Sequence, residues 1–291
     1  MAKKRSAKSL SNGRPPNVTK PKASLSSQAT RTLIRSHHQL NKQLEVARSK
    51  GDDAKVQELE KQIEDLGGLK SYQQASIQGQ SNDRGGDSSV VLMKWLEPFR
   101  NALSKSDPKL RLLEVGALST TNACSRSGHF QVQRIDLNSQ GEGILQQDFM
   151  ERPLPEKNEE KFDLISLSLV LNYVPDAAGR GEMLKRTCQF LDTRHHLDRE
   201  EELRSVLPTL FLVLPAPCVT NSRYMDETRL GEIMTSLGFC LLQRKQTAKL
   251  VYYLWQLKAK PSQKPLVFPK KEVNPGAGRN NFSIVLTHSR S

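Results

Sequence analysis

The sequence predicts an α/β fold in which a parallel sheet is covered by helices on both faces. From residue 109 onward, short continuous apolar runs alternate with segments of helical periodicity. Strands that are buried on both faces have this composition. A glycine or an aspartate stands directly after the first runs, as expected where parallel strands end at a ligand-binding edge. The predicted fold class is therefore α/β, with a Rossmann-like sheet.

Each element is predicted from its own pattern. The segment at about 87–99 is a strongly apolar helix that begins at Asp87 and is expected to pack on the sheet. Gly238 is expected to close a helix at 226–237, because glycine is favoured after the last helical turn. We expect strands at residues 111–115, 130–135, 162–167, 210–214, 239–246, 250–257 and 282–286, and a further helix at 180–191.

Three segments organise the chain. Residues 1–28 are rich in Lys, Arg, Ser and Pro and predict a basic disordered tail. Residues 29–105 predict a helical arm and a connector, and residues 106–291 predict the sheet domain.

Within the arm, apolar residues at helical spacing are interrupted at Gly51 and resume after Asp52 or Asp53, which predicts a helical hairpin that ends at Gly67-Gly68. This hairpin is an RNA-binding arm, a packing appendage or a dimer-forming coiled coil, and the sequence does not separate these roles or predict an oligomeric state. The histidine pairs at 37–38 and 195–196 are expected to be solvated helix residues rather than ligands.

The charge of the chain predicts a polyanionic partner. The net charge is +13, and residues 1–50 hold twelve Lys/Arg and one acid. Such a surface gains free energy by displacing the counterions of a phosphate backbone. The run Lys3-Lys4-Arg5 is typical of a nuclear import or RNA-contact patch, and the alternative is a solubilising tail. No apolar run is long enough to span a bilayer, so no membrane partner is expected.

The four cysteines predict neither a metal site nor a disulfide framework. They are scattered singly, at positions 124, 188, 218 and 240, with no C-x-x-C pair. Free cysteines suit a reducing compartment, the cytosol or the nucleus.

Residues at the ends of successive strands match the needs of S-adenosylmethionine. Gly116 allows the backbone to approach the amino-acid end of the cofactor. Asp136 offers one carboxylate to both ribose hydroxyls, and Asp148-Phe149 offers a polar group and an apolar slot for adenine. A nicotinamide cofactor is disfavoured, because it expects G-x-G-x-x-G where residues 114–119 contain one glycine.

These residues also carry a resemblance to a known family. The chain resembles the fungal nucleolar methyltransferases that modify N(1) of an adenine in large-subunit (25S) ribosomal RNA, and is similar to their animal relatives, which act as S-adenosylmethionine sensors. The resemblance runs from about residue 67 to 286. It departs from the wider methyltransferase pattern in lacking the second and third loop glycines. Its most specific stretches are Tyr72 to Ser76, Gly79-Gln80, Gly85 to Ser89, Leu113 to Gly116, Ile135 to Asn138, and Leu214-Pro215 to Asn221 through Tyr224.

The resemblance implies an S-adenosylmethionine-dependent methyltransferase domain at 106–291 that acts in the nucleus and nucleolus. Its implied substrate is large-subunit rRNA or a pre-ribosomal particle. By the resemblance Gly116 and Asp136 contact the cofactor, and their neighbours Glu114 and Leu137 are included in the predicted site. The alternatives are a non-catalytic sensor that binds protein partners and a small-molecule methyltransferase, which the basic arm disfavours.

The sequence leaves the catalytic residues open. Asn172 and Tyr173 follow the strand at 162–167, where amino-methyltransferases place the substrate base. Asn172 would hydrogen-bond the adenine edge, and Tyr173 would stack on the base. The favoured alternative is that residues 169–174 begin a packing helix. Rival RNA contacts are Asn221, Arg223 and Tyr224. The basic loop at 258–279 is a second RNA contact or a solvated loop.

Overall fold

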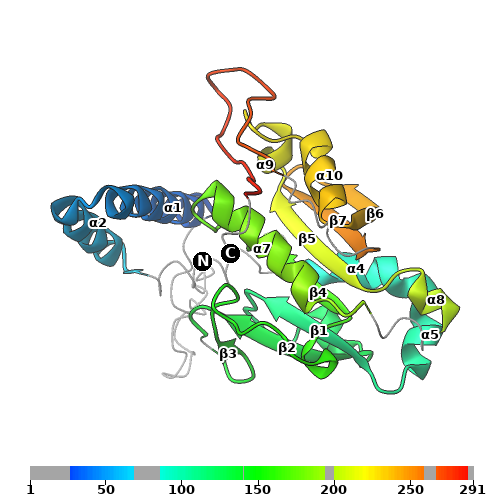
Figure 1. Ribbon diagram of the computed structural model, residues 1–291. Helices are drawn as coiled ribbons and strands as arrows, with labels where there is room; N and C mark the ends of the chain where they lie inside the picture. Colours follow the sequence, from blue (N-terminus) through cyan, green and yellow to red (C-terminus); the bar gives the residue numbers. More distant parts are fainter. Residues whose placement is uncertain (1–26, 69–85, 140, 194–199, 259–266, 288–291) are drawn as a thin grey trace, which may run out of the picture.

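The computed structural model describes residues 27–68, 86–139, 141–193, 200–258 and 267–287, and a seven-stranded sheet forms its centre (Figure 1). The strands lie in the order β3-β2-β1-β4-β5-β7-β6. This order confirms the predicted Rossmann-like sheet. The strands span Leu110–Val115 (β1), Phe130–Asp136 (β2), Leu145–Gln146 (β3), Leu164–Ser168 (β4), Thr209–Pro215 (β5), Phe239–Gln246 (β6) and Leu250–Leu257 (β7).

The sheet is mixed rather than parallel throughout, which corrects the prediction. The five strands β1 to β5 pair in parallel. In contrast, β7 pairs antiparallel with both β5 and β6. Only residues 247–249 join β6 to β7, and so short a connection can join only antiparallel neighbours. The strands β6 and β7 therefore form a hairpin at one edge of the sheet.

One face of the sheet is covered by three helices, which are α7 (Ala177–Phe190), α9 (Pro217–Thr220) and α10 (Glu227–Ser236). Asp176 caps α7 by accepting a hydrogen bond from the backbone N–H of Gly179 at 2.7 Å. Apolar residues of these helices pack in one cluster with the strand residues on the same face; Leu184 and Ile233 are fully buried there. This cluster is the larger part of the hydrophobic core.

The opposite face is covered by short helices, which are α4 (Ser89–Leu96), η2 (Glu97–Phe99), α5 (Arg100–Lys105), α6 (Ala123–Arg126) and α8 (Glu201–Arg204). Leu92 and Leu96 of α4 are buried in the second core cluster, so the predicted packing of this helix on the sheet is confirmed. Asp87 accepts from the backbone N–H groups of Ser89 (2.9 Å) and Ala123 (2.5 Å). One carboxylate therefore fixes the starts of both α4 and α6.

The predicted helical hairpin is confirmed and consists of α1 (Ser27–Lys50) and α2 (Asp53–Asp65). Asp52 caps α2 through the backbone N–H of Lys55 at 3.1 Å. A small core of Leu44, Ala47 and Leu59 joins the two helices. Residues 1–26 of the predicted tail lie outside the described residues.

His37 is buried, which corrects the expectation of a solvated residue. It is 6% exposed, and its Nδ1 lies 2.8 Å from the side-chain nitrogen of Asn41. Burial lowers the pKa of the His37 imidazole, because the charged form loses its hydration. The side chain of His38 and both histidines at 195–196 lie outside what the structure describes.

Residues 282–286 form an extended segment rather than the predicted strand. Phe282, Ile284 and Leu286 are buried against the helices of the larger core cluster. The segment crosses α7 so closely that a Cβ atom on Gly181 would lie 1.9 Å from the carbonyl oxygen of Val285. Glycine at this position therefore permits direct contact between the helix and the C-terminal segment.

Candidate functional site

The candidate site lies at the edge of the sheet where the parallel strands end. β1 leads into a turn at Gly116, whose backbone N–H donates to the carbonyl of Ile135 at 2.8 Å. The φ angle of Gly116 is +73°, which is strained for any residue with a side chain. A Cβ atom there would lie 2.6 Å from Cγ2 of Val170, in the turn after β4. Glycine therefore allows two strand ends to approach each other.

Glu114 presents a buried acceptor just before this turn. Its Oε1 accepts a hydrogen bond from the side chain of Asn122 at 2.6 Å. Its Oε2 is buried and has no hydrogen-bond partner among the described residues. Burial raises the pKa of the Glu114 carboxyl, while the hydrogen bond from Asn122 and the charge of Arg134 oppose the rise. An unsatisfied carboxylate oxygen in this place suits an ammonium group such as that of the cofactor's methionine end.

Asp136 ends β2 on the same edge. Its Oδ1 accepts from the backbone N–H of Asn138 at 2.9 Å, which fixes the carboxylate in a tight turn. Leu137, between them, is 64% exposed. Asp136 and Leu137 therefore differ in their surroundings. Asp136 is a half-buried carboxylate, and Leu137 is an apolar side chain that is open to a ligand.

Asp148 and Phe149 follow β3 but point to different surroundings. Asp148 accepts from the backbone N–H of Met150 at 2.7 Å. The ring of Phe149 is only 2% exposed, and its centroid lies 5.3 Å from that of Phe190 in the core. The structure thus keeps Asp148 at the strand-end edge and places the Phe149 ring beneath it.

The segment after β4 is a turn, so the favoured prediction of a helix beginning at residues 169–174 is wrong. Leu169 has a φ of +59°, and α7 begins only at Ala177. The backbone N–H of Tyr173 donates to the carbonyl of Val170 at 2.9 Å. Within this turn Oδ1 of Asn172 is buried and accepts no hydrogen bond from the described residues. A buried unpaired acceptor costs free energy, so this oxygen is suited to an incoming donor.

The start of α4 also belongs to this edge. The hydroxyl oxygens of Ser88 and Ser168 lie 2.7 Å apart, which joins the N-terminal end of α4 to the last residue of β4. These residues were not among the predicted contacts, because the pairing spans 80 positions of sequence and leaves no local pattern.

Arg180 is a further residue that sequence reasoning missed. Its guanidinium donates to the carbonyls of Pro175 (3.2 Å) and Ser283 (2.8 Å) and lies 4.8 Å from the ring centroid of Phe282. It therefore joins the turn after β4 to the C-terminal segment. Its partner at 283 is 103 residues away, so no spacing rule predicts the contact.

The rival RNA contacts predicted after β5 all lie against the C-terminal segment. The backbone of Asn221 accepts from the backbone N–H of Asn280 at 3.0 Å. Arg223 donates to the carbonyl of Gly276 at 3.0 Å, and the ring of Tyr224 lies beneath the ammonium of Lys270.

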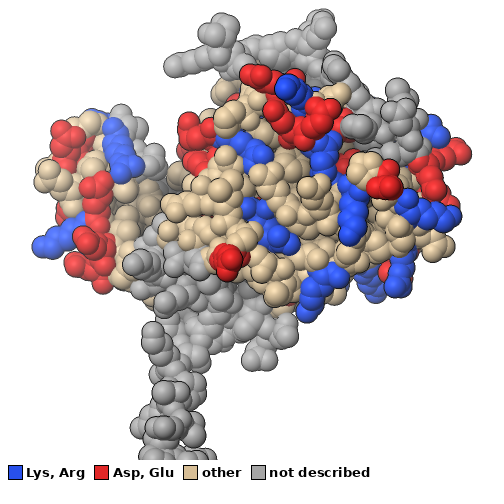
Figure 2. All heavy atoms as spheres, turned by 90° about the horizontal axis from the view of Figure 1, so that it is seen from below, with Lys and Arg blue, Asp and Glu red and all other residues tan. Residues whose placement is uncertain are grey.

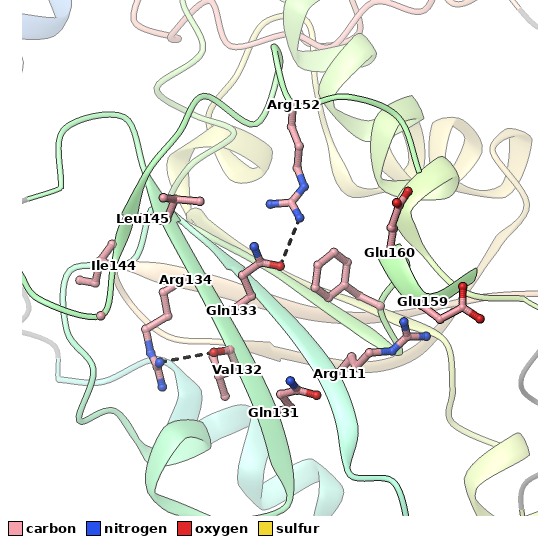
Figure 3. Close-up of a pocket in the computed structure, with 12 residues that line it drawn as sticks. Arg111, Gln131, Val132, Gln133, Arg134, Ile144, Leu145, Arg152, Glu159 and Glu160 are labelled. Atoms are coloured by element: carbon pink, nitrogen blue, oxygen red, sulfur yellow. Dashed lines mark hydrogen bonds between the residues drawn. The ribbon is translucent and has the colours of Figure 1, made fainter. Parts of the chain in front are cut away.

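A hollow of about 780 Å³ lies on β1 and β2, and none of the predicted cofactor residues lines it (Figure 3). The described residues of the connections at 137–144 and 147–163 contain no α-helix, so this face stays open. Arg152 bridges it by donating to Gln133 at 3.2 Å. The hollow is lined by Arg111, Gln131, Val132, Gln133, Arg134, Gly143, Ile144, Leu145, Arg152, Glu159, Glu160 and Phe162.

The residues at the strand-end edge fit S-adenosylmethionine. The turn at Gly116 leaves no room for a side chain, and Glu114 carries an orphaned carboxylate oxygen. Acidic acceptors at the ends of β1 and β2 match an ammonium and a ribose. In the described part of the chain, no cluster of His, Cys, Asp and Glu is arranged to hold a metal ion. None of the described helices is long and apolar enough to cross a membrane.

Solved structures resemble this chain distantly. The N-methyltransferase NodS from Bradyrhizobium japonicum, in complex with S-adenosyl-L-homocysteine, is 14% identical, covers 56% of this chain and 86% of its own, and has a TM-score of 0.35. The 16S rRNA methylase RmtB is 15% identical, covers 78% of this chain and 75% of its own, and has a TM-score of 0.36.

Sequence comparisons are more specific. The 25S rRNA adenine-N(1) methyltransferase of Schizosaccharomyces pombe is 42% identical over 256 residues, which are 87% of this chain and 89% of that protein. The 25S rRNA (adenine(2142)-N(1))-methyltransferase of Saccharomyces cerevisiae is 45% identical over 228 residues, 77% of this chain. The match spans 62% of that longer relative. A family model described as 25S rRNA (adenine(2142)-N(1))-methyltransferase, Bmt2, matches residues 57–284. The chain therefore belongs to the Bmt2 family.

Proposed function

We propose that this protein uses S-adenosylmethionine to methylate N(1) of an adenine in large-subunit (25S) rRNA. The observation that carries the proposal is family membership over residues 57–284, joined to a fitting site at the strand ends. The two relatives are named as methyltransferases, which favours an enzyme over a non-catalytic sensor. Because large-subunit rRNA is made in the nucleolus, we also propose a nuclear and nucleolar location and a pre-ribosomal particle as the partner.

Within this proposal the cofactor lies along the ends of β1, β2 and β3. Gly116 lets the backbone approach the methionine end, and Glu114 accepts from its ammonium group. Asp136 accepts from the ribose hydroxyls, with Leu137 against the sugar. Asp148 fixes the adenine amine, and the backbone at Phe149 lines the adenine slot. The cofactor supplies an activated methyl group, so the protein's task is mainly alignment.

The turn after β4 is proposed to hold the substrate base. Adenine N(1) has an in-plane lone pair, so its attack requires no general base. Methylation makes the ring cationic, and the exocyclic amine becomes a stronger donor. The buried Oδ1 of Asn172 is an acceptor suited to that amine, and it stabilises the developing charge. Tyr173, half-buried in the same turn, is proposed to stack on the unstacked base.

The function is tested by mapping large-subunit rRNA in a strain that lacks this protein. A methyl group on N(1) occupies the Watson–Crick edge and stops reverse transcriptase. One primer-extension stop is expected to disappear in the deletion strain and to return when the gene is restored. An unchanged pattern of stops would contradict the proposed activity.

The role of Asn172 is tested by two substitutions. Asn172→Ala is expected to lower kcat for methyl transfer to rRNA about 100-fold, since it removes a preorganised group that acts on developing charge. Cofactor affinity should stay unchanged. Asn172→Asp keeps an acceptor oxygen and should retain more activity than the alanine variant. If Asn172→Ala keeps kcat within about twofold, Asn172 does not contact the reacting base.

A further inference from the structure

Positive charge is concentrated at the two ends of the chain. Residues 1–50 hold twelve Lys/Arg against one acid, and residues 258–291 hold seven against one. Residues 51–257 hold 25 Lys/Arg against 29 acids, a net charge of −4. The face drawn in Figure 2 accordingly shows both signs interspersed on the described residues. The C-terminal part therefore provides a second basic region, distinct from the tail.

The described portion of this region is a closed, anchored loop. Phe268 and Leu286 pair through two backbone hydrogen bonds of 2.9 and 3.1 Å, which close residues 268–286 into what we call the C-terminal loop. The backbone N–H of Val285 donates to the carbonyl of Ala177 in α7 at 2.8 Å. The side chain of Ser222 donates to the carbonyl of Phe282 at 2.5 Å. A freely solvated loop would lack these anchors.

Cations from the surrounding elements hold the backbone of the C-terminal loop. Arg223, after β5, donates to the carbonyl of Gly276 at 3.0 Å, and Arg229 of α10 donates to that of Pro269 at 2.9 Å. Arg223 adds positive charge beside the loop's own lysines, whereas Arg229 is also ion-paired with Glu232 at 3.5 Å. Lys270 and Lys271 are exposed. The ammonium of Lys270 lies 4.2 Å from the ring centroid of Tyr224, which orients it without neutralising it.

The C-terminal loop also borders the proposed substrate turn. Arg180 donates both to Ser283 of the loop and to Pro175, three residues after Asn172. The side chain of Asn280 donates to the carbonyl of Pro217 at 2.6 Å, at the start of α9. The loop is thus fastened to the segments that follow β4 and β5, beside the edge where the cofactor residues lie.

We propose that the C-terminal loop, together with Arg223 and Tyr224, binds the phosphodiester backbone of the RNA next to the target adenine. This inference rests on the proposed function. A basic surface held rigidly beside the site gains affinity by releasing counterions and positions the strand without reading its sequence. The C-terminal loop would thereby place the target base at the turn that contains Asn172.

The test is a double substitution, Lys270→Gln with Lys271→Gln, in the full-length protein. Its affinity for a large-subunit rRNA transcript is measured across a salt series. We expect affinity about 10-fold weaker near physiological salt. The slope of log affinity against log salt should become shallower by roughly 1.4 to 1.8, because each lost phosphate contact contributes about 0.7 to 0.9. Cofactor affinity should not change.

The matched control is Lys105→Gln with Lys109→Gln. These exposed lysines both precede β1, at the end of the sheet opposite to the candidate site. This variant should keep wild-type affinity and slope. The assignment of the C-terminal loop would be overturned if both double variants changed RNA affinity and salt slope equally, or if Lys270→Gln with Lys271→Gln changed neither. The proposed function would stand in that case, provided that the wild-type protein methylates rRNA. A wild-type protein that binds cofactor yet methylates no rRNA would overturn both.

Discussion

Gly116→Ala is expected to weaken S-adenosylmethionine binding roughly 30- to 100-fold. A side chain at a φ of +73° costs about 1–2 kcal/mol. In addition, the new Cβ atom would lie 2.6 Å from Val170, so the turns after β1 and β4 must move apart. Both turns border the proposed cofactor site. Calorimetric titration with S-adenosylmethionine measures the loss directly.

Gly128→Ala is the matched control for this substitution. Gly128 has a φ of +76°, but nothing lies within 4 Å of the position that a Cβ atom would take there. It therefore shares the backbone strain without the clash, and it precedes β2 at the other edge of the sheet. Gly128→Ala should lose about 1–2 kcal/mol of unfolding free energy and Gly116→Ala at least as much, but only Gly116→Ala should lose cofactor affinity. Equal affinities for the two variants would remove Gly116 from the site.

Much of the fold follows from local composition. Apolar runs placed six of the seven strands of the sheet within a few residues, including β6 and β7 with the bounds that the structure has, but no run predicted the short strand β3. The direction of β7 did not follow, because a run buried on both faces has the same composition in a parallel or an antiparallel strand. The three-residue turn before Leu250 was the available indication.

The predictions for His37 and for residues 169–174 were wrong because they relied on residue type rather than on position in the chain. His37 stands four residues after Leu33 and three before Leu40, on the apolar stripe of α1, so its burial follows from helical spacing. In the turn after β4, Pro175 disfavours a helical residue before it, and Asp176 is a typical cap. These two residues place the start of α7 correctly.

Residues of the candidate site could be proposed from the sequence only where a single residue type at a strand end indicates the role. Glycine or a carboxylate directly after a strand is visible in sequence, which is how Gly116 and Asp136 were proposed. The orphaned oxygens of Glu114 and Asn172 were not visible, because burial and missing partners depend on packing. The same holds for Arg180, whose contact with Ser283 joins segments 103 residues apart.

The C-terminal segment illustrates the limit most clearly. Residues 282–286 alternate in a manner typical of a strand, yet their apolar side chains pack on helices. Both neighbours of β5 in the sheet, β4 and β7, are already supplied by other segments. The segment instead crosses α7 at Gly181, and this contact determines the second large effect that we expect.

Gly181→Ala is expected to destabilise the protein by about 3 kcal/mol, or roughly 6–12 °C in Tm. In an ordinary helix interior this change would stabilise by about 1 kcal/mol. Here the added Cβ would lie 1.9 Å from the carbonyl oxygen of Val285, and a backbone atom cannot rotate away. The C-terminal loop must lift from α7, which exposes Phe282 and Ile284. Urea unfolding and limited proteolysis of the loop measure the effect.

Gly231→Ala, in the middle of α10, separates this contact from helix propensity. Nothing lies within 4 Å of the Cβ position at Gly231, so the same substitution should there raise the unfolding free energy by up to about 1 kcal/mol. Opposite signs at the two glycines are therefore expected. If Gly181→Ala is as stable as Gly231→Ala, then the C-terminal loop does not rest directly on α7. In that case the contacts between the C-terminal loop and α7 would not hold the loop's lysines beside the substrate turn.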